Sequence, residues 1–372
     1  MNQGSSVPLA HLDRLTDDIG IFEHAQLDEP RRNVGYCTDD AGRLLALGSD
    51  AISDRPESRR LATVSLQFLR RAFDGEGFRL RLGPGEVWTD DPSSDDATAR
   101  ALHGLGTAAA RAPWDDVRHG SLELFEEASR FRSSYLRAGA HALLGATAVL
   151  AIDSDSIAAS RVAEWARVVL DVPGVSAEWP WPESRLTYSN AIVPHALLAL
   201  AHVREAHDDV ARALQLLEWL VDVETLDDHF SFTPVAGRGP RTTKVPEFDQ
   251  QPIEAWTMAS ACECAYEVTG LERWASRASR AALWFTGLND TGTLVYDPRT
   301  GAGFDGLQRE GVNLNRGAES TIAAVGAMTI LETLAASPAP SGDRQTSVNA
   351  LSNWGTDATA APTHRSAAPY VR

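Results

Sequence analysis

The stretch Ile322-Ala323-Ala324-Val325-Gly326-Ala327 has the composition of a helix that is small and apolar on every side. A second stretch of this kind is Ala138-Gly139-Ala140-His141-Ala142. A helix without a charged face is stable only when it is buried, so both segments are predicted to lie inside a layer of other helices. The two stretches therefore favour an all-helical fold with an inner and an outer layer.

Helical periodicity extends outward from these stretches over most of the chain. Alanine, leucine and arginine recur at spacings of three and four residues, which places them on one face of a helix. The predicted helices are 40–51, 58–73, 96–111, 119–131, 135–151, 157–171, 190–206, 208–222, 253–269, 271–287 and 316–335. Hairpin signals are scarce, although Asn289-Asp290-Thr291-Gly292 and Asp297-Pro298 suggest short turns.

Two types of helix alternate along the chain. Those of the inner type begin near residues 40, 96, 135, 190, 253 and 316 and carry little charge after their first turn. Those of the outer type carry Arg, Glu and Asp on one face, as in 208–218 and 272–280. Six buried helices that alternate with outer ones, at roughly 40- to 65-residue intervals, predict a six-hairpin toroid, the (α/α)6 barrel.

The predicted toroid forms a single domain over residues 1–336. Five outer helices are clear from the pattern, so the sixth is expected from the N-terminal segment around 8–18. Residues 337–372 are rich in Ser, Thr, Ala and Pro and are predicted to be a disordered tail.

The formal net charge of −17 disfavours nucleic acid and anionic membrane surfaces as partners. Residues 1–12 lack the pattern of a signal peptide, and no apolar run is long enough to span a bilayer. The three cysteines cannot all pair, and no metal-site spacing surrounds them. We therefore expect a cytoplasmic protein with no metal, no cofactor, and no nucleic-acid or membrane partner.

Polar clusters stand directly before the predicted inner helices. In a toroid these helices run the same way, so their N-termini meet at one mouth, where free N–H groups and the helix dipoles stabilise anions. Acids and amides beside tryptophan and tyrosine are typical of a carbohydrate cleft. The clusters are Gly35-Tyr36-Cys37-Thr38-Asp39-Asp40, Asp95-Asp96, Trp179-Pro180-Trp181-Pro182-Glu183 with Thr187-Tyr188-Ser189-Asn190, Phe248-Asp249-Gln250-Gln251-Pro252, and Asn313-Leu314-Asn315-Arg316-Gly317-Ala318-Glu319.

Two carboxyl groups in unlike environments can divide into a proton donor and a proton acceptor, as inverting glycoside hydrolysis requires. We predict Glu183 as the general acid and Asp249 as the general base. Asp39 and Asp40 are the competing pair, although Asp before a helix is also an ordinary N-cap.

The remaining residues of the clusters are candidates for binding a sugar. Trp179, Trp181 and Tyr188 are predicted to stack on sugar rings. Glu319 lies one turn into an apolar helix and either pairs with Arg316 or acts in the site. His195 is more simply a histidine of an inner helix. The candidates for contacts with sugar hydroxyls are Asn190, Gln250, Gln251, Asn315, Arg316, Glu319 and His195.

The clusters together resemble a bacterial family of helical-toroid proteins in the six-hairpin glycosidase-like superfamily. The resemblance begins at Asp17-Asp18-Ile19-Gly20-Ile21-Phe22-Glu23-His24 and covers roughly residues 15–335. Members of this family occur alone or fused behind glycosyltransferase domains. The resemblance implies a toroid fold, an oligosaccharide or glycan substrate, and a possible glycosyltransferase partner.

Two positions depart from the family pattern: Ser189 stands where Asp is expected, and Ala99 replaces the Gly before Arg100. If the missing acid is catalytic in relatives, this chain binds sugar without cleaving it. Three hypotheses thus stay open: an inverting glycoside hydrolase, a sugar epimerase or isomerase using His24 and His195, and a non-catalytic module that binds a glycan or a glycosyltransferase.

Overall fold

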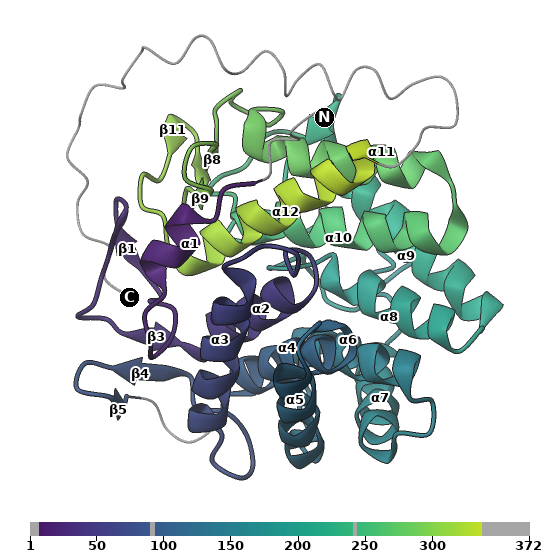
Figure 1. Cartoon of the computed structure of the whole chain (residues 1–372). Helices are drawn as coiled ribbons and strands as arrows, with labels where there is room; N and C mark the ends of the chain where they lie inside the picture. The colour runs from purple at the N-terminus through teal and green to yellow at the C-terminus, as the bar shows by residue number, and fades with distance from the viewer. Residues whose placement is uncertain (1–6, 90–93, 241–243, 337–372) are drawn as a thin grey trace.

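The computed structural model describes residues 7–89, 94–240 and 244–336, which form two concentric layers of helices (Figure 1). The inner layer consists of α2 (Thr38–Ser49), α4 (Asp95–Arg111), α6 (Leu136–Ile152), α8 (Ile192–Val203), α10 (Pro252–Thr269) and α12 (Ala318–Ala336). The outer layer consists of α1 (Ala10–Leu15), α3 (Ser58–Ala72), α5 (Asp115–Ala128), α7 (Ile157–Leu170), α9 (His207–Glu224) and α11 (Glu272–Leu283), which continues into the 3-10 turn η1 (Trp284–Thr286). The tail predicted at 337–372 lies outside the described residues.

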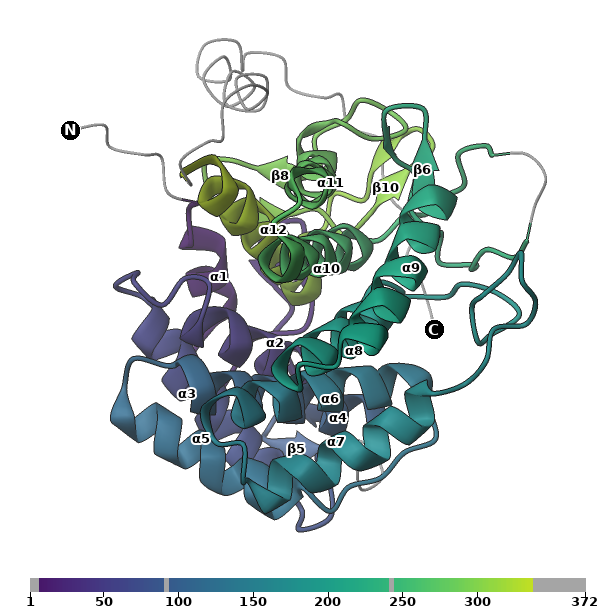
Figure 2. The same ribbon diagram turned by 90° about the vertical axis from the view of Figure 1, so that its right-hand side faces the viewer.

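The inner helices form a closed ring. Each packs against the next inner helix along the chain, and α12 returns to pack against α2. Each also packs against the outer helix of its own hairpin, and α1 supplies the sixth hairpin by packing on α12, which packs against α11 as well (Figures 1 and 2). The fold is therefore an (α/α)6 toroid, which confirms the prediction from the helix pattern.

Glycines allow the inner helices to approach each other closely. A Cβ atom on Gly106 of α4 would lie 2.1 Å from the carbonyl oxygen of Gly145 in α6. A Cβ atom on Gly145 would lie 2.1 Å from the carbonyl oxygen of Leu102. Any side chain at these positions would push the two backbones apart, so the small residues of the inner helices are a requirement of their packing.

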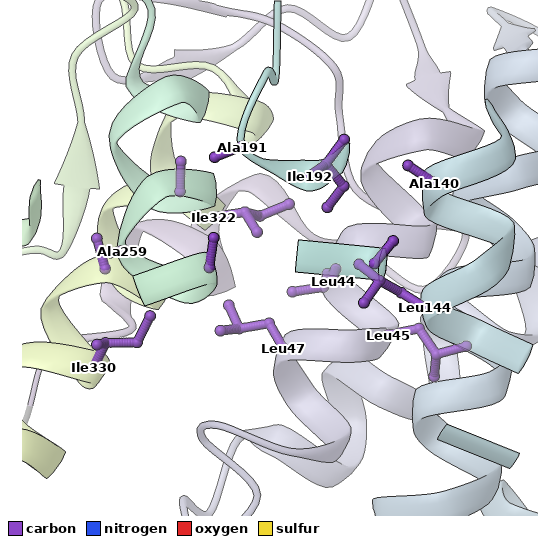
Figure 3. Packing of buried hydrophobic residues seen from close by; sticks show 14 of the residues in the cluster. Leu44, Leu45, Leu47, Ala140, Leu144, Ala191, Ile192, Ala259, Ile322 and Ile330 are labelled. Carbon is purple, nitrogen blue, oxygen red and sulfur yellow. The ribbon is translucent and has the colours of Figure 1, made fainter. Parts of the chain in front are cut away.

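The apolar core lies between and inside the two layers. Leu44 and Leu144 are buried on α2 and α6, and Ile192 and Ile322 are buried on α8 and α12. Figure 3 shows these side chains, from four different inner helices, gathered in one region of the core. This common core fixes the positions of the helix N-termini relative to each other, because close-packed protein interiors leave the helices little freedom to move.

Short antiparallel strands occur in the loops, which are more ordered than the scarce hairpin signals suggest. The predicted turn at Asp297-Pro298 closes the pair of β8 (Tyr296–Asp297) with β9 (Ala302–Gly303). In the three-stranded sheet, Tyr36 pairs with Leu82, and Leu82 pairs with Trp88. That sheet consists of β3 (Tyr36–Cys37), β4 (Arg81–Gly83) and β5 (Val87–Trp88). The other pairs are β1 (Ala25–Gln26) with β2 (Glu29–Pro30), β6 (Thr225–Leu226) with β7 (His229–Phe230), and β10 (Leu307–Gln308) with β11 (Gly311–Val312).

Residues from the two ends of the described chain meet where the ring closes. The backbone N–H of Val7 donates a hydrogen bond to Oε2 of Glu332 near the end of α12, at 3.4 Å. Within the described ranges, no helix combines the length and the apolar character needed to cross a membrane.

Candidate active site

Arg43, in the second turn of α2, lies between two carboxyl groups. Its Nη1 is 2.7 Å from Oδ1 of Asp40, and its Nη2 is 2.6 Å from Oε2 of Glu319 on α12. The side chains of Arg43 and Asp40 are only 8% and 4% exposed, whereas that of Glu319 is 35% exposed. One cation therefore faces two carboxyl groups, so full ionisation would leave a net negative charge in a largely buried place.

Burial raises the pKa of Asp40 to about 8. The loss of hydration outweighs the attraction of Arg43, and the negative charge of Glu319 raises the pKa further. Asp40 therefore retains its proton near neutral pH and has the protonation state of a proton donor.

Asp39, the neighbour of Asp40, has a different environment. Its Oδ2 is 3.1 Å from Nη1 of Arg100, which lies in the second turn of α4. Its Oδ1 is buried and has no hydrogen-bond partner among the described residues. Arg100 also lies over the ring of Tyr188, and the Tyr188 hydroxyl donates to Oδ2 of Asp96 at 2.9 Å. The consecutive acids therefore have unlike surroundings: Asp40 is buried between Arg43 and Glu319, whereas Asp39 is paired with Arg100 and keeps one oxygen without a described partner.

Arg137, in the first turn of α6, holds the loop before α8. Its Nη1 is 2.5 Å from Oε2 of Glu183, and its Nη2 is 2.9 Å from Oδ1 of Asn190. Its Nε donates to the backbone carbonyl of Tyr188 at 2.8 Å. The indole N–H of Trp181 donates to the same oxygen of Glu183 at 3.1 Å. These two donors fix the position of the Glu183 carboxyl group against α6.

Glu254, in the first turn of α10, completes this network. It is buried and accepts hydrogen bonds from the backbone N–H of Ser189, and from the backbone N–H and side-chain amide of Asn190. Burial and the nearby charge of Glu224 raise the pKa of Glu254 to about 8, although the N–H donors oppose this. Contacts among α2, α4, α6, α10, α12 and the loop before α8 thus bring the N-terminal ends of the inner helices together at one end of the ring, which we call the mouth.

The tryptophans of the loop before α8 are buried. The ring of Trp179 meets Trp219 of α9 edge to face at 5.0 Å, and the ring of Trp181 stacks on Trp219 at 6.1 Å. This location differs from the predicted stacking on sugar, because Trp179 and Trp181 are 6% and 0% exposed. Tyr188 is partly exposed between Arg100 and Arg137 and is the aromatic side chain of this loop that reaches the mouth.

The segment before α10 contributes less to the site than the sequence suggested. Gln250 is fully buried, and its amide bonds to the backbone of Phe232 and to the side chains of Trp284 and Asp290, so no polar atom is left for a sugar hydroxyl. Asp249 is exposed, and no residue in the described ranges forms a hydrogen bond with its carboxylate. Gln251 is partly exposed at the N-cap of α10.

The cluster before α12 also has structural roles. Oδ1 of Asn315 accepts a hydrogen bond from the backbone N–H of Leu27 at 2.9 Å. Arg316 lies over the ring of Phe304 at 4.8 Å, and its Nε has no partner within the described part of the chain. Of the two alternatives for Glu319, the pair with Arg316 is not formed, because Glu319 binds Arg43 instead.

The two histidines of the epimerase hypothesis have different surroundings. His24 is exposed beside Glu23, with Nε2 3.6 Å from Oε1. His195, one turn into α8, faces a central cavity, and burial lowers its pKa to about 4. In the described ranges, no hydrogen bond joins the two histidines, and no group of three or more His, Cys, Asp and Glu side chains is arranged to hold a metal.

Arg43, Arg137 and Glu254 lie in the mouth but were not among the residues predicted for it from the sequence. Arg137 and Glu254 are each the one charged residue in the first turn of their helix, and each is followed by a run of uncharged residues. That pattern is the sequence signal that could have identified these residues, because a charged side chain at the start of a buried helix requires a partner from another element.

Comparison of the sequence with protein-family models and with curated proteins gave no match. Solved structures match over most of the chain. A sugar epimerase from a ruminal bacterium is 12% identical, with a TM-score of 0.65, and the match covers 89% of this chain and 95% of that one. Cellobiose 2-epimerase from Bacillus thermoamylovorans is 13% identical, with a TM-score of 0.64 and coverages of 88% and 96%. An α-mannanase from Bacteroides thetaiotaomicron is 11% identical, with a TM-score of 0.59 and coverages of 87% and 93%.

These matches establish a fold shared with six-hairpin glycosidase-like enzymes. The association with glycosyltransferases, which the sequence resemblance implies, stays a prediction.

Proposed function

We propose that this protein is a carbohydrate-active enzyme that hydrolyses a glycosidic bond of a small oligosaccharide at the mouth formed by the inner-helix N-termini. The observation that carries the proposal is the unlike environment of two consecutive acids. Asp40 is buried and protonated beside Arg43 and Glu319, whereas Asp39 is paired with Arg100 and has one oxygen without a partner. General acid–base catalysis requires such a division between a donor and an acceptor.

In the proposed reaction, Asp40 donates its proton to the glycosidic oxygen as the bond from that oxygen to the anomeric carbon breaks. A water molecule attacks the anomeric carbon, and Oδ1 of Asp39 takes the proton that this water loses. The products are two shorter sugars, and the proton on Asp39 returns to Asp40 through solvent. No oxidant, reductant or metal enters this scheme.

Glu183 and Asp249, the acid and base first predicted from the sequence, are less suited to these roles. Oε2 of Glu183 already accepts hydrogen bonds from Arg137 and Trp181, so this oxygen is held within the protein and is not free to reach a glycosidic oxygen. Asp249 has no described partner that would position it as a base. We therefore assign Glu183 to substrate binding at the rim, where its side chain is 37% exposed.

The surroundings of the acids also support a carbohydrate substrate. Tyr188 offers a ring near carboxylates that can accept hydrogen bonds from hydroxyls, namely Asp96, Glu183 and Glu319, each of which is partly exposed. The structural matches named as an α-mannanase and a cellobiose 2-epimerase supply a second, weaker support, since both names refer to sugars.

The test is an NMR time course of the purified protein with manno-, gluco- and galacto-oligosaccharides. We expect one oligosaccharide to be cleaved, with a new anomeric signal of inverted configuration. Asp39→Asn and Asp40→Asn should each lower the rate by about 10²- to 10⁴-fold with an unchanged circular dichroism spectrum. Asp209→Asn, in an exposed pair with Arg212 on the outer helix α9, is the matched control and should retain full activity.

Three outcomes contradict the proposal. A changed configuration at C2 without cleavage would favour the epimerase hypothesis. Binding of a sugar that is neither cleaved nor altered would favour a non-catalytic module. Full activity of both Asp39→Asn and Asp40→Asn would move the chemistry to other residues.

A further inference from the structure

A cavity of about 500 Å³ extends along the axis of the toroid, away from the mouth that holds Asp39 and Asp40. Residues of all six inner helices line it, and Arg43 lies at its inner end. Asp50, Arg111 and Thr333 line its outer end and are exposed, at the C-terminal ends of α2, α4 and α12. The cavity therefore opens at the opposite end of the ring, and its volume lies in the usual range of about 300–1,000 Å³ for small-molecule sites.

Three histidines from three consecutive inner helices line the deep part of this cavity. The Nδ1 atoms of His103 and His141 are 3.4 Å apart, and His195 lies on the next inner helix. Nε2 of His141, Nδ1 of His195 and Oγ1 of Thr147 have no hydrogen-bond partner among the described residues. His141 and Thr147 are only 5% and 4% exposed. Buried polar groups are nearly always paired, so these atoms indicate a site that is completed by a ligand.

The charges around the cavity restrict the ligand. Burial lowers the pKa of His103 to about 3 and that of His195 to about 4, and also lowers the pKa of His141, so all three rings are neutral. Arg43 is already paired with two carboxyl groups. The outer end has the negative ends of the helix dipoles and the acids Asp50, Glu263 and Glu267, with Arg111 and His202 as the basic groups facing them. An anion is therefore disfavoured.

One wall of the cavity is aromatic. Trp256 of α10 is partly exposed in the cavity, and a Cβ atom on Gly326 of α12 would lie 2.4 Å from its Nε1. Gly326 thus makes room for the indole at this position. Thr257 and Ser260 of the same helix also line the cavity, so a broad aromatic surface stands near hydroxyl and imidazole groups. This combination can bind a molecule that has both an apolar face and many hydroxyls.

We propose that the axial cavity is a second ligand site, which binds a neutral polyhydroxylated molecule, a monosaccharide or a polyol, that enters from the C-terminal end of the inner helices. The ligand would hydrogen-bond to His141, His195 and Thr147 and pack against Trp256. This site does not depend on hydrolysis at the other end, because the two regions share only Arg43.

The test is isothermal titration calorimetry of the full chain with D-mannose, D-glucose and D-mannitol, and with glucose 6-phosphate as the anionic counterpart. We expect a neutral probe to bind and glucose 6-phosphate not to bind. Thr147→Val removes one hydroxyl at constant volume and should weaken binding by about 3- to 10-fold. Ala148→Trp places a large ring in the cavity and should abolish binding. Thr63→Val, on the outer helix α3 and away from the cavity, should leave binding unchanged.

Glu183→Gln distinguishes this site from the mouth: it should weaken any binding of a probe at the mouth and leave binding in the axial cavity unchanged. If Ala148→Trp does not fold, chemical-shift changes at the ring of His141 on addition of the neutral probe replace it. The proposal is overturned if no neutral probe binds. It is also overturned if Glu183→Gln, but not Thr147→Val, weakens binding, or if the bound sugar is converted to its C2 epimer and His141→Phe stops the conversion.

Discussion

The arginines at the N-terminal ends of the inner helices and the histidines deeper in the same ring differ in how their polar atoms are satisfied. Arg43, Arg100 and Arg137 each contact at least one carboxyl group of a neighbouring element. His141 and His195 keep ring nitrogens that have no described partner. The mouth is therefore organised by its own charges before any substrate arrives, whereas the axial cavity leaves hydrogen-bonding capacity for a ligand.

This difference also concerns stability. A paired charge in a buried network cannot be removed without exposing its partner to an unfavourable environment. A buried polar atom without a partner already destabilises the folded state. Its removal should therefore lower the free energy of unfolding only slightly. Substitutions at the two ends of the ring should therefore have effects of different size.

The largest effect is expected for Arg43→Met. Asp40 and Glu319 would lose their shared cation, and the free energy of unfolding should fall by about 3–5 kcal/mol. Urea denaturation measures this, and Arg14→Met is the control, because Arg14 forms an exposed pair with Glu29 and should cost at most about 1 kcal/mol. Equal losses in the two variants would show that the network at the mouth adds no stability.

The next effect is a dependence of activity on pH. Because the pKa of Asp40 is about 8, the protonated form needed for donation should decline above that pH, and the rate should fall about tenfold per unit. The same group makes the folded state bind more protons than the unfolded state between its unfolded pKa of about 3.9 and about 8. Stability should therefore fall as the pH rises through this window.

A pH–rate profile and urea denaturation at several pH values check both trends. Asp40→Asn should remove part of the pH dependence of stability. A rate that stays constant from pH 7 to pH 10 would contradict the assignment of Asp40 as the proton donor.

The same substitution at the two ends sharpens the comparison further. The hydroxyl of Thr38, at the start of α2, donates to the carbonyl of Arg79 at 2.5 Å. Thr38→Val leaves that carbonyl without its donor and should cost about 1–3 kcal/mol.

The smallest effect is expected for Thr147→Val in the axial cavity, because its hydroxyl has no described partner. The free energy of unfolding should change by less than about 0.5 kcal/mol, or rise slightly. Thermal and urea denaturation of the two threonine variants make the comparison. A loss at Thr147 as large as that at Thr38 would indicate that the cavity hydroxyl is satisfied within the protein.

The helical layers were predictable because their signal is local. The inner helices are small and apolar all round, and the outer ones alternate apolar and charged faces within a few turns. The start of α6 at Leu136 and the start of α10 at Pro252 lie within one residue of the predicted starts. The sixth outer helix was expected over 8–18 but is shorter, because α1 spans only Ala10–Leu15.

The side-chain partners of the site were less predictable, because they are distant in sequence. Arg43 binds Glu319, which is 276 positions away in the sequence, and no local sequence pattern predicts this pair. Gln250 reads as a polar residue of a cleft, but its amide is bonded within the protein. Trp181 reads as a sugar platform, but its ring is covered by Trp219. The sequence composition identifies the polar clusters, whereas tertiary contacts decide which of their residues remain available to bind a ligand.

The contact between Val7 and Glu332 brings the first described residues beside the end of the last inner helix. The ring of hairpins is thus closed, because the first and last described elements pack against each other. A circularly permuted form of residues 7–336, with Val7 and Ala336 joined by a short linker and new termini at the exposed residues Ser154 and Asp155, would keep every interface between inner helices. The mouth and the axial cavity therefore depend on how the six hairpins pack, and not on which hairpin comes first in the chain.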